Sequence, residues 1–204
     1  MEPFDASLRH DPRSALAFHA RGQALNEQKQ YGRAIEAFDE AIRLDPAFAA
    51  AFNGRGFAYN GKKQYDRALC DLDEAIRLDP LCAQAFNNRG YAWNGKRQHD
   101  RAIEALNEAI RLDPLFADAL NGRGFAYLCQ ERHDRAIEDL TEAIRLDPGF
   151  ASAFNNRGQA WTGAKQYDRA IADLDAAIRL DPDFAAAFVN REKASRESGR
   201  RERG

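Results

Sequence analysis

The hexapeptide AIRLDP occurs five times in this chain of 204 residues, and each copy begins 34 residues after the one before. The copies stand at 41–46, 75–80, 109–114, 143–148 and 177–182. Six of the seven prolines keep the same spacing, and so do a glycine ladder and two alanine ladders. A period of this length is typical of a solenoid, in which neighbouring units cover each other's apolar faces. The repeat therefore predicts a row of similar units.

The period divides the chain into a single array. Its five full units are 15–48, 49–82, 83–116, 117–150 and 151–184. Residues 1–14 include PFDASLRHDP, which aligns with the second half of a unit, so we interpret them as an N-terminal half-repeat. Residues 185–198 match the first half of a unit, with Glu192 at the glycine position, and are expected to form a C-terminal capping helix. Residues 199–204 form a charged tail.

Each unit is expected to hold two helices. In the second unit, apolar spacing predicts a first helix over roughly 47–62 and a second over roughly 66–78. Asp66 is expected to N-cap the second helix. The Asp of the hexapeptide is expected to N-cap the following unit's first helix, with proline at the first helical position. The glycine ladder, which includes Gly56, is expected to mark close contact between the paired helices, with the alanine ladders opposite.

The motif F-x2-R-G-x2-Y at 52–59, followed by A-x3-L at 68–72 and by Pro80, resembles the tetratricopeptide repeat (TPR) family. The resemblance extends from about Pro3 to Ser195. It implies an all-α solenoid of antiparallel helix pairs that forms a right-handed superhelix. It also implies a non-catalytic protein–protein interaction module or scaffold, with the first helix of each unit lining a concave groove that binds a peptide or protein segment.

The groove face combines a row of asparagines with three aromatic residues. An asparagine amide can donate and accept hydrogen bonds to a peptide backbone, and an aromatic ring can take apolar side chains. The aromatics can instead pack against adjacent helices, and asparagine in this part of the helix is common in the family at large. Gly54 and Gly122 alternate with the second asparagines, which suggests a two-unit rhythm of open steps in the groove. The residues predicted to line the groove are Asn53, Phe57, Asn87, Asn88, Tyr91, Asn121, Phe125, Asn155 and Asn156.

An arginine recurs once in every unit, at 21, 55, 89, 123 and 157, and again at 191. A recurrent arginine near a helix seam is expected to pair with a recurrent acid. One candidate set is the hexapeptide Asp, and the other is Asp71, Asp139 and Asp173. A basic stripe that binds a ligand is the functional alternative.

Composition and motifs narrow the function classes. The formal net charge of −2 gives no reason to expect a nucleic-acid partner. The three cysteines lack metal-binding spacing, and no apolar run is long enough to span a bilayer, so a cytoplasmic location without a membrane partner is predicted. No catalytic constellation is present, and we predict neither enzyme activity, nor a cofactor, nor a metal.

Two further statements concern partners. Co-chaperone TPR domains hold a C-terminal carboxylate with lysine, asparagine and arginine. The matching places from the first unit onward hold His19, Gln23, Gly54, Gln84 and Asn88, and no register places a lysine or arginine there, so a chaperone-tail clamp is not expected. The alternative to a peptide-binding module is a self-associating array, end to end or dimeric, or a fragment of a longer TPR protein.

Overall fold

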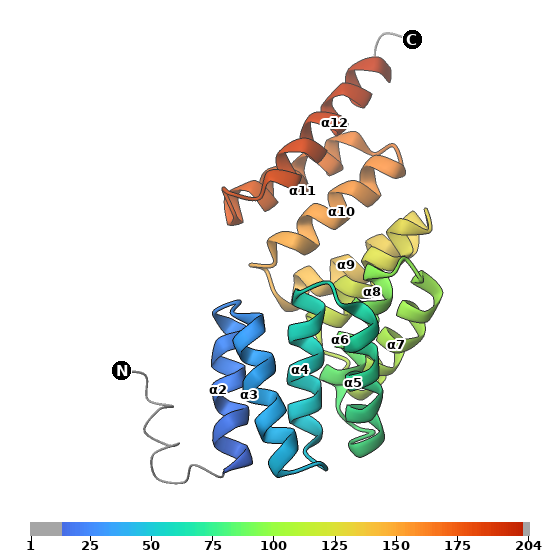
Figure 1. The fold of residues 1–204 in the computed structure, drawn as a ribbon. Coiled ribbons are helices and arrows are strands. Elements are labelled where there is room, and N and C mark those ends of the chain that lie inside the picture. The colour runs from blue at the N-terminus through green and yellow to red at the C-terminus, as the bar shows by residue number, and fades with distance from the viewer. Residues whose placement is uncertain (1–13, 202–204) are drawn as a thin grey trace. The chain divides into compact units, whose positions relative to one another are not determined.

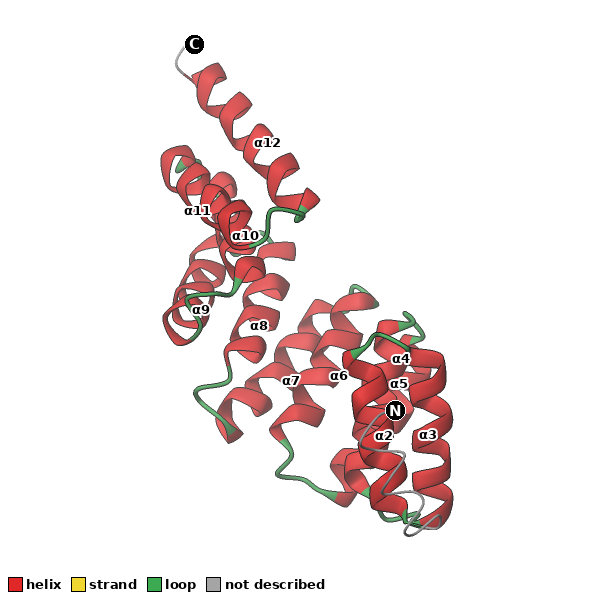
Figure 2. Cartoon of the chain, turned by 90° about the vertical axis from the view of Figure 1, so that its left-hand side faces the viewer, coloured by secondary structure: helices red, strands yellow, loops and turns green. Residues whose placement is uncertain are grey.

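The computed structural model describes residues 14–201, and these form eleven helices and no strand (Figures 1 and 2). From α2 to α6, and again from α7 to α12, consecutive helices run antiparallel and are joined by short loops, which confirms the all-α fold of helix pairs. The predicted 1–14 half-repeat lies outside the described residues except for Ser14. The helices are α2 Ala15–Glu27, α3 Tyr31–Leu44, α4 Ala49–Gly61, α5 Tyr65–Leu78, α6 Ala83–Gly95, α7 His99–Leu112, α8 Ala117–Cys129, α9 His133–Leu146, α10 Ala151–Gly163, α11 Tyr167–Leu180 and α12 Ala185–Arg201.

The chain divides into two compact units, one ending at Gln98 and the other beginning at His99. In the first unit each helix packs on the next, and α4 also packs on both α2 and α6. The second unit repeats this arrangement from α7 to α12, with α10 packed on both α8 and α12. The division falls between α6 and α7, which the sequence placed in the single repeat 83–116.

The loop inside each helix pair contains one residue with a left-handed backbone conformation, that is, with positive φ. Lys29, Lys63, Arg97, Glu131 and Lys165 occupy this place, with φ between 57° and 59°. In the second repeat the Lys63 N–H donates to the Asn60 carbonyl and the Gln64 N–H donates to the Tyr59 carbonyl, both at 2.9 Å. This is the Schellman pattern that closes a helix C-terminus. Glycine is the usual residue at this position. Because none of these loops has glycine there, the sequence did not predict the turn.

The hexapeptide ends a helix, as expected, but its Asp does not N-cap the next one. Asp45 is the C-cap of α3, and its Oδ1 accepts a hydrogen bond from the Ala47 N–H at 3.0 Å. The helix α4 begins only at Ala49, with Phe48 as its N-cap and Pro46 in the preceding turn. The prediction was wrong because the Asp side chain stabilises the turn itself, two residues on, instead of reaching the helix.

The predicted N-cap at Asp66 is also wrong by two positions. The N-cap of α5 is Gln64, which makes no side-chain capping hydrogen bond, and Asp66 lies inside the first turn. Its carboxylate there is favoured by the positive end of the helix dipole, so an acid at this place stabilises the helix without capping it.

The glycine ladder does mark close helix contact, but a larger side chain than alanine lies opposite. A Cβ added at Gly56 would lie 2.7 Å from the Leu72 side chain and 3.4 Å from the Ala68 carbonyl. Gly124 and Gly158 meet Leu140 and Leu174 in the same way. These leucines are fully buried, so each glycine accepts the branched end of a leucine from its paired helix.

Candidate functional site

The three predicted groove aromatics are exposed on the first helices of their repeats. Phe57 on α4 is 41% exposed and Tyr91 on α6 is 60% exposed, both in the first unit. Phe125 on α8, in the second unit, is 37% exposed. Large apolar side chains left this open are available for contact with another molecule.

Two further tyrosines, which the sequence analysis did not place in the site, extend the aromatic surface of the first unit. The Tyr31 ring meets Phe57 edge-on with centroids 6.4 Å apart. Burial raises the pKa of Tyr91 above its usual value, and the nearby phenols of Tyr65 and Tyr31 add to the shift. Tyr31 and Tyr65 recur at the same place in the repeat, and this recurrence could have identified them from the sequence.

Glycines let these rings lie flat against the neighbouring repeat. A Cβ at Gly61 would lie 2.5 Å from the Tyr31 ring, so any side chain there would displace the tyrosine. Gly95 receives Tyr65 in the same manner, and in the second unit Gly163 receives His133. The close approach therefore repeats, while the ring changes from phenol to imidazole.

The second unit contains a cavity of about 500 Å³ on the equivalent face. Of the predicted site residues it includes Phe125. Its other lining residues come from α8 to α12 and are mostly polar or ionisable, a property that the groove pattern did not reveal. The cavity is lined among others by Leu128, His133, Gln159, Asn190, Lys193 and Glu197.

The predicted asparagines do not all face outward. In the first unit the Asn88 amide donates to Asn53 Oδ1 at 2.9 Å, from one first helix to the preceding one. Asn88 is only 4% exposed, and its backbone carbonyl accepts from the buried Asn60 at 2.8 Å. Asn88 is therefore unavailable to a ligand in this arrangement and instead fixes the Asn53 side chain.

In the second unit four asparagines form a directional chain of amides. Asn190 donates to Asn155 at 2.8 Å, Asn155 donates to Asn156 at 3.3 Å, and Asn156 donates to Asn121 at 3.0 Å. Asn155 is 4% exposed, so its role in this arrangement is to join α10 to its neighbours. Asn121 ends the chain, and its amide nitrogen makes no hydrogen bond within the described residues.

Asn87 differs from the other predicted asparagines. Its side chain is half-buried on α6 and makes no hydrogen bond with any residue in 14–201. Both its donor and its acceptor are thus free for a ligand, one turn before the exposed Tyr91.

The two glycines between the asparagine pairs are not open steps in the groove. A Cβ at Gly54 would collide with the Phe38 ring of α3, and a Cβ at Gly122 would lie 3.2 Å from Leu106 of α7. These glycines give room to the second helix of the preceding repeat. The proposed two-unit groove rhythm is therefore wrong, because neither glycine leaves an open step.

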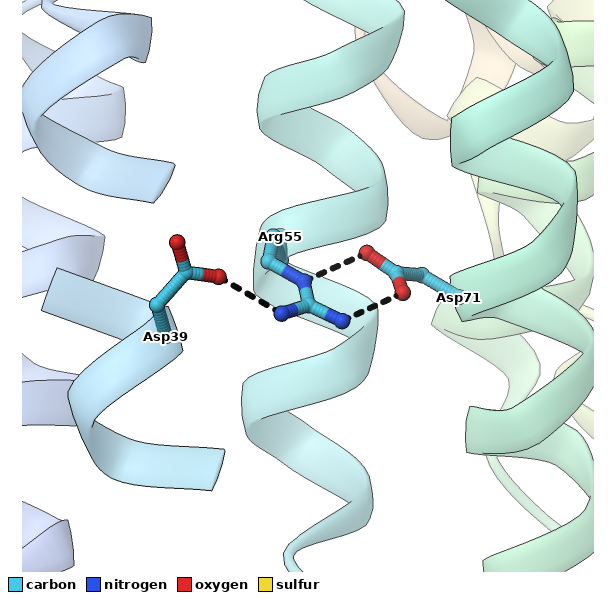
Figure 3. A network of polar contacts seen from close by, with 3 residues as sticks. All are labelled: Asp39, Arg55 and Asp71. Carbon is cyan, nitrogen blue, oxygen red and sulfur yellow. Dashed lines mark hydrogen bonds and ion pairs between the residues drawn. The ribbon is translucent and has the colours of Figure 1, made fainter. Parts of the chain in front are cut away.

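Three arginines of the ladder each pair with an acid sixteen residues later, on the second helix of the same repeat. Arg55 donates to both oxygens of Asp71 at 2.7 Å and to Asp39 of the preceding repeat at 2.6 Å (Figure 3). Burial alone would lower the pKa of Arg55, but the hydrogen bonds to Asp71 and Asp39 outweigh it and raise that pKa. The arginine therefore joins two second helices.

The same bidentate pairs occur in the second unit. Arg123 binds Asp139 through two bonds of 2.7 Å, and Arg157 binds Asp173 at 2.7 and 2.8 Å. The hexapeptide Asp is thus not the partner. Arg55, Arg123 and Arg157 are committed to structure, which disfavours the alternative of a basic ligand-binding stripe at these three positions.

Comparison with known proteins agrees with this geometry. A TPR repeat model matches residues 22–62, and a tetratricopeptide repeat model matches 53–115, 95–149 and 122–185. The chain is a tetratricopeptide repeat protein. No curated protein sequence matches it significantly.

Solved TPR structures resemble the chain over most of its length. YrrB, described as a TPR protein with an unusual peptide-binding site, is 25% identical with a TM-score of 0.65, over 94% of this chain and 98% of YrrB. MamA is 27% identical with a TM-score of 0.65, over 80% of this chain and 96% of MamA. TTC0263 of Thermus thermophilus has a TM-score of 0.76 at 17% identity, over 89% and 98%, and shows the fold alone. The TPR fold supports a protein–protein interaction scaffold.

Two observations bear on other functions. Within residues 14–201 no helix has the length and apolar character that crossing a bilayer requires. The same stretch contains no cluster of three or more His, Cys, Asp or Glu side chains placed to bind a metal ion.

Proposed function

We propose that this TPR protein binds extended segments of a protein partner along the face that the first helices form within each unit. The observation that carries the proposal is the exposure of Phe57, Tyr91 and Phe125, which recur at one position of the repeat. Apolar side chains of the partner would lie against these rings, and the free amide of Asn87 would bind its backbone. The peptide-binding site described for YrrB, a structural relative, supports this choice.

The first test is the double variant Asn87→Ala with Tyr91→Ala. Partners would be isolated with the wild-type chain, and the affinity of one identified partner segment would be measured by calorimetry. Removing an exposed aromatic anchor and a free amide should weaken binding at least about tenfold, as for an interface hot spot. Unchanged affinity with retained helicity would show that the partner binds elsewhere.

A matched control separates binding from packing. Leu81 is also strongly exposed, but it lies in the loop between α5 and α6 and not on a first helix. Leu81→Ala should leave the affinity for the same segment unchanged. An equal loss in this variant would mean that any exposed apolar residue contributes, and the groove assignment would lose its support.

Self-association is the second candidate, and α12 provides the observation that favours it. Phe188 and Val189 are 48% and 66% exposed there, whereas Phe86 at the matching position in α6 is 8% exposed. A second copy of the chain would cover this apolar surface. Light scattering over a concentration series tests this: a mass that rises with concentration, and falls back to that of a monomer with Val189→Lys, supports association through α12.

A further inference from the structure

Two second helices, α5 and α7, begin with an acid that meets a side chain thirty residues later, in the next repeat. In the first unit the Lys96 ammonium pairs with Asp66 and also lies 5.6 Å from the centre of the Trp93 ring. In the second unit Gln130 donates to Asp100 at 2.8 Å. These contacts span thirty residues, so the next member of the series is Asp134 with residue 164.

Residue 164 is alanine, and the series stops there. Asp134 is exposed and makes no hydrogen bond or ion pair with any described residue. The space beside it is a cavity of about 600 Å³, lined by Ala164, Gln166 and the residues from Glu131 to Arg135. The matching cavity in the first unit, where Lys96 is present, measures about 300 Å³. The alanine thus leaves open a place that holds an ammonium group elsewhere in the same chain.

The two cavities also differ in the charge of the residues that line them. Lys63, Arg67 and Lys96 line the first cavity with one acid, Asp66. The second cavity has two basic and two acidic residues: Glu131 stands where the first has Lys63, Arg132 where it has Gln64, and Ala164 where it has Lys96. Its lining is therefore balanced in charge where that of the first is basic, which makes the second cavity the more favourable site for a cation.

His133 also lines this cavity, in the place of Tyr65 in the first unit. Its Nδ1 is buried, so the exposed acceptors beside the cavity are the carboxylates of Glu131 and Asp134. An ammonium group has three donors to give to such acceptors. We propose that this cavity, beside Asp134 at the start of α9, binds the ammonium group of a lysine side chain from the protein partner.

The site adjoins the 500 Å³ groove cavity and shares Glu131 and His133 with it. A segment bound in the groove would therefore place its lysine here, and in that respect the inference rests on the proposed function. The ammonium site itself needs no groove ligand. Phe125 lines only the groove cavity, so Phe125→Ala tests the groove while leaving the ammonium site intact.

The test uses the full chain labelled with 15N and titrated with N-acetyl-lysine amide. We expect saturable amide shifts over 133–135 and at Ala164, and none with N-acetyl-norleucine amide, which lacks the ammonium. Ala164→Lys should abolish the shifts, because the tethered ammonium occupies the site. Asp134→Asn should weaken binding about threefold, the range of an exposed ion pair.

The first unit offers a matched control, because Lys96→Ala should create a second site for the same compound at the start of α5. Three results would overturn the proposal: no saturable shift near Asp134, equal shifts with the norleucine compound, or unchanged binding in Ala164→Lys. N-acetyl-glutamate amide provides the opposite charge, and stronger shifts with it at 133–135 would identify an anion site instead.

Discussion

The two units of this protein share one repeat motif but hold their helices together differently. In the first unit, buried asparagines clamp consecutive first helices: Asn26 donates to the Gly54 carbonyl at 2.9 Å, and Asn60 donates to that of Asn88 at 2.8 Å. In the second unit the same place is held by Leu128, which cannot donate, and by Thr162, which bonds within its own helix. The motif thus fixes which helices meet, while single substitutions decide whether polar or apolar contacts hold them.

The arginine pairs show the same difference. In the first unit the second partner of Arg55 is a carboxylate, Asp39, whereas in the second unit Asn107 and Thr141 take that place beside Arg123 and Arg157. Both partners of the second unit are neutral. The charge of each arginine there is balanced by one acid alone.

The two units should differ most in the free energy of unfolding that each loses when the acid bound to its arginine is removed. Asp139→Ala leaves Arg123 mostly buried with only the neutral Asn107, and should lower the free energy of unfolding by about 3 kcal/mol. Asp71→Ala leaves Arg55 paired with Asp39, and should cost about 2 kcal/mol. Urea unfolding of both variants measures the difference. An equal cost, or a larger one for Asp71→Ala, would show that the charge of the arginine's second partner does not affect stability.

A smaller effect is expected from the asparagine clamp. Asn60→Leu copies the second unit's Leu128 into the first and removes the bond to the Asn88 carbonyl. Because the Asn60 Oδ1 is itself buried without a partner, the loss should be limited to about 1 kcal/mol. Hydrogen exchange of α4 and α6 would locate the change. If the variant proves more stable than wild type, the clamp serves to set helix register and not to stabilise.

Much of the fold could be predicted because it follows from periodic residues. The helix pairs and the glycine seam repeat every 34 residues, so one correct assignment applies to every repeat, and the pairing of Arg55 with an acid recurs at Arg123 and Arg157. The capping predictions failed at Asp45 and Asp66 for a common reason. A short acidic side chain near a helix end can bond the turn, cap the helix or lie in the first turn, and composition alone does not choose among these.

The candidate site was harder to predict because its polar residues interact with one another. Asparagine at a groove position gave no indication that Asn88 would be buried and hold Asn53, or that Asn155 would lie within a chain of amides. Gly54 was interpreted as an opening although it accommodates Phe38. The ammonium cavity depends on what is missing at Ala164, and a repeat pattern identifies such a position only when the lost contact is known from another unit.

The smallest predicted effect is a change in the turn between paired helices, and it should be equal in the two units. It therefore tests whether the stability differences predicted between the units come from single side chains. Lys63 and Lys165 occupy the same left-handed turn position, both at φ 58°. Lys63→Gly and Lys165→Gly should each stabilise the protein by about 0.5–1 kcal/mol, since glycine adopts this conformation without the steric cost of a Cβ. Thermal and urea unfolding would measure both. If only one variant gains stability, the two units differ in their backbone turns as well, and the contrasts at Asp139 and Asn60 cannot be assigned to single side chains.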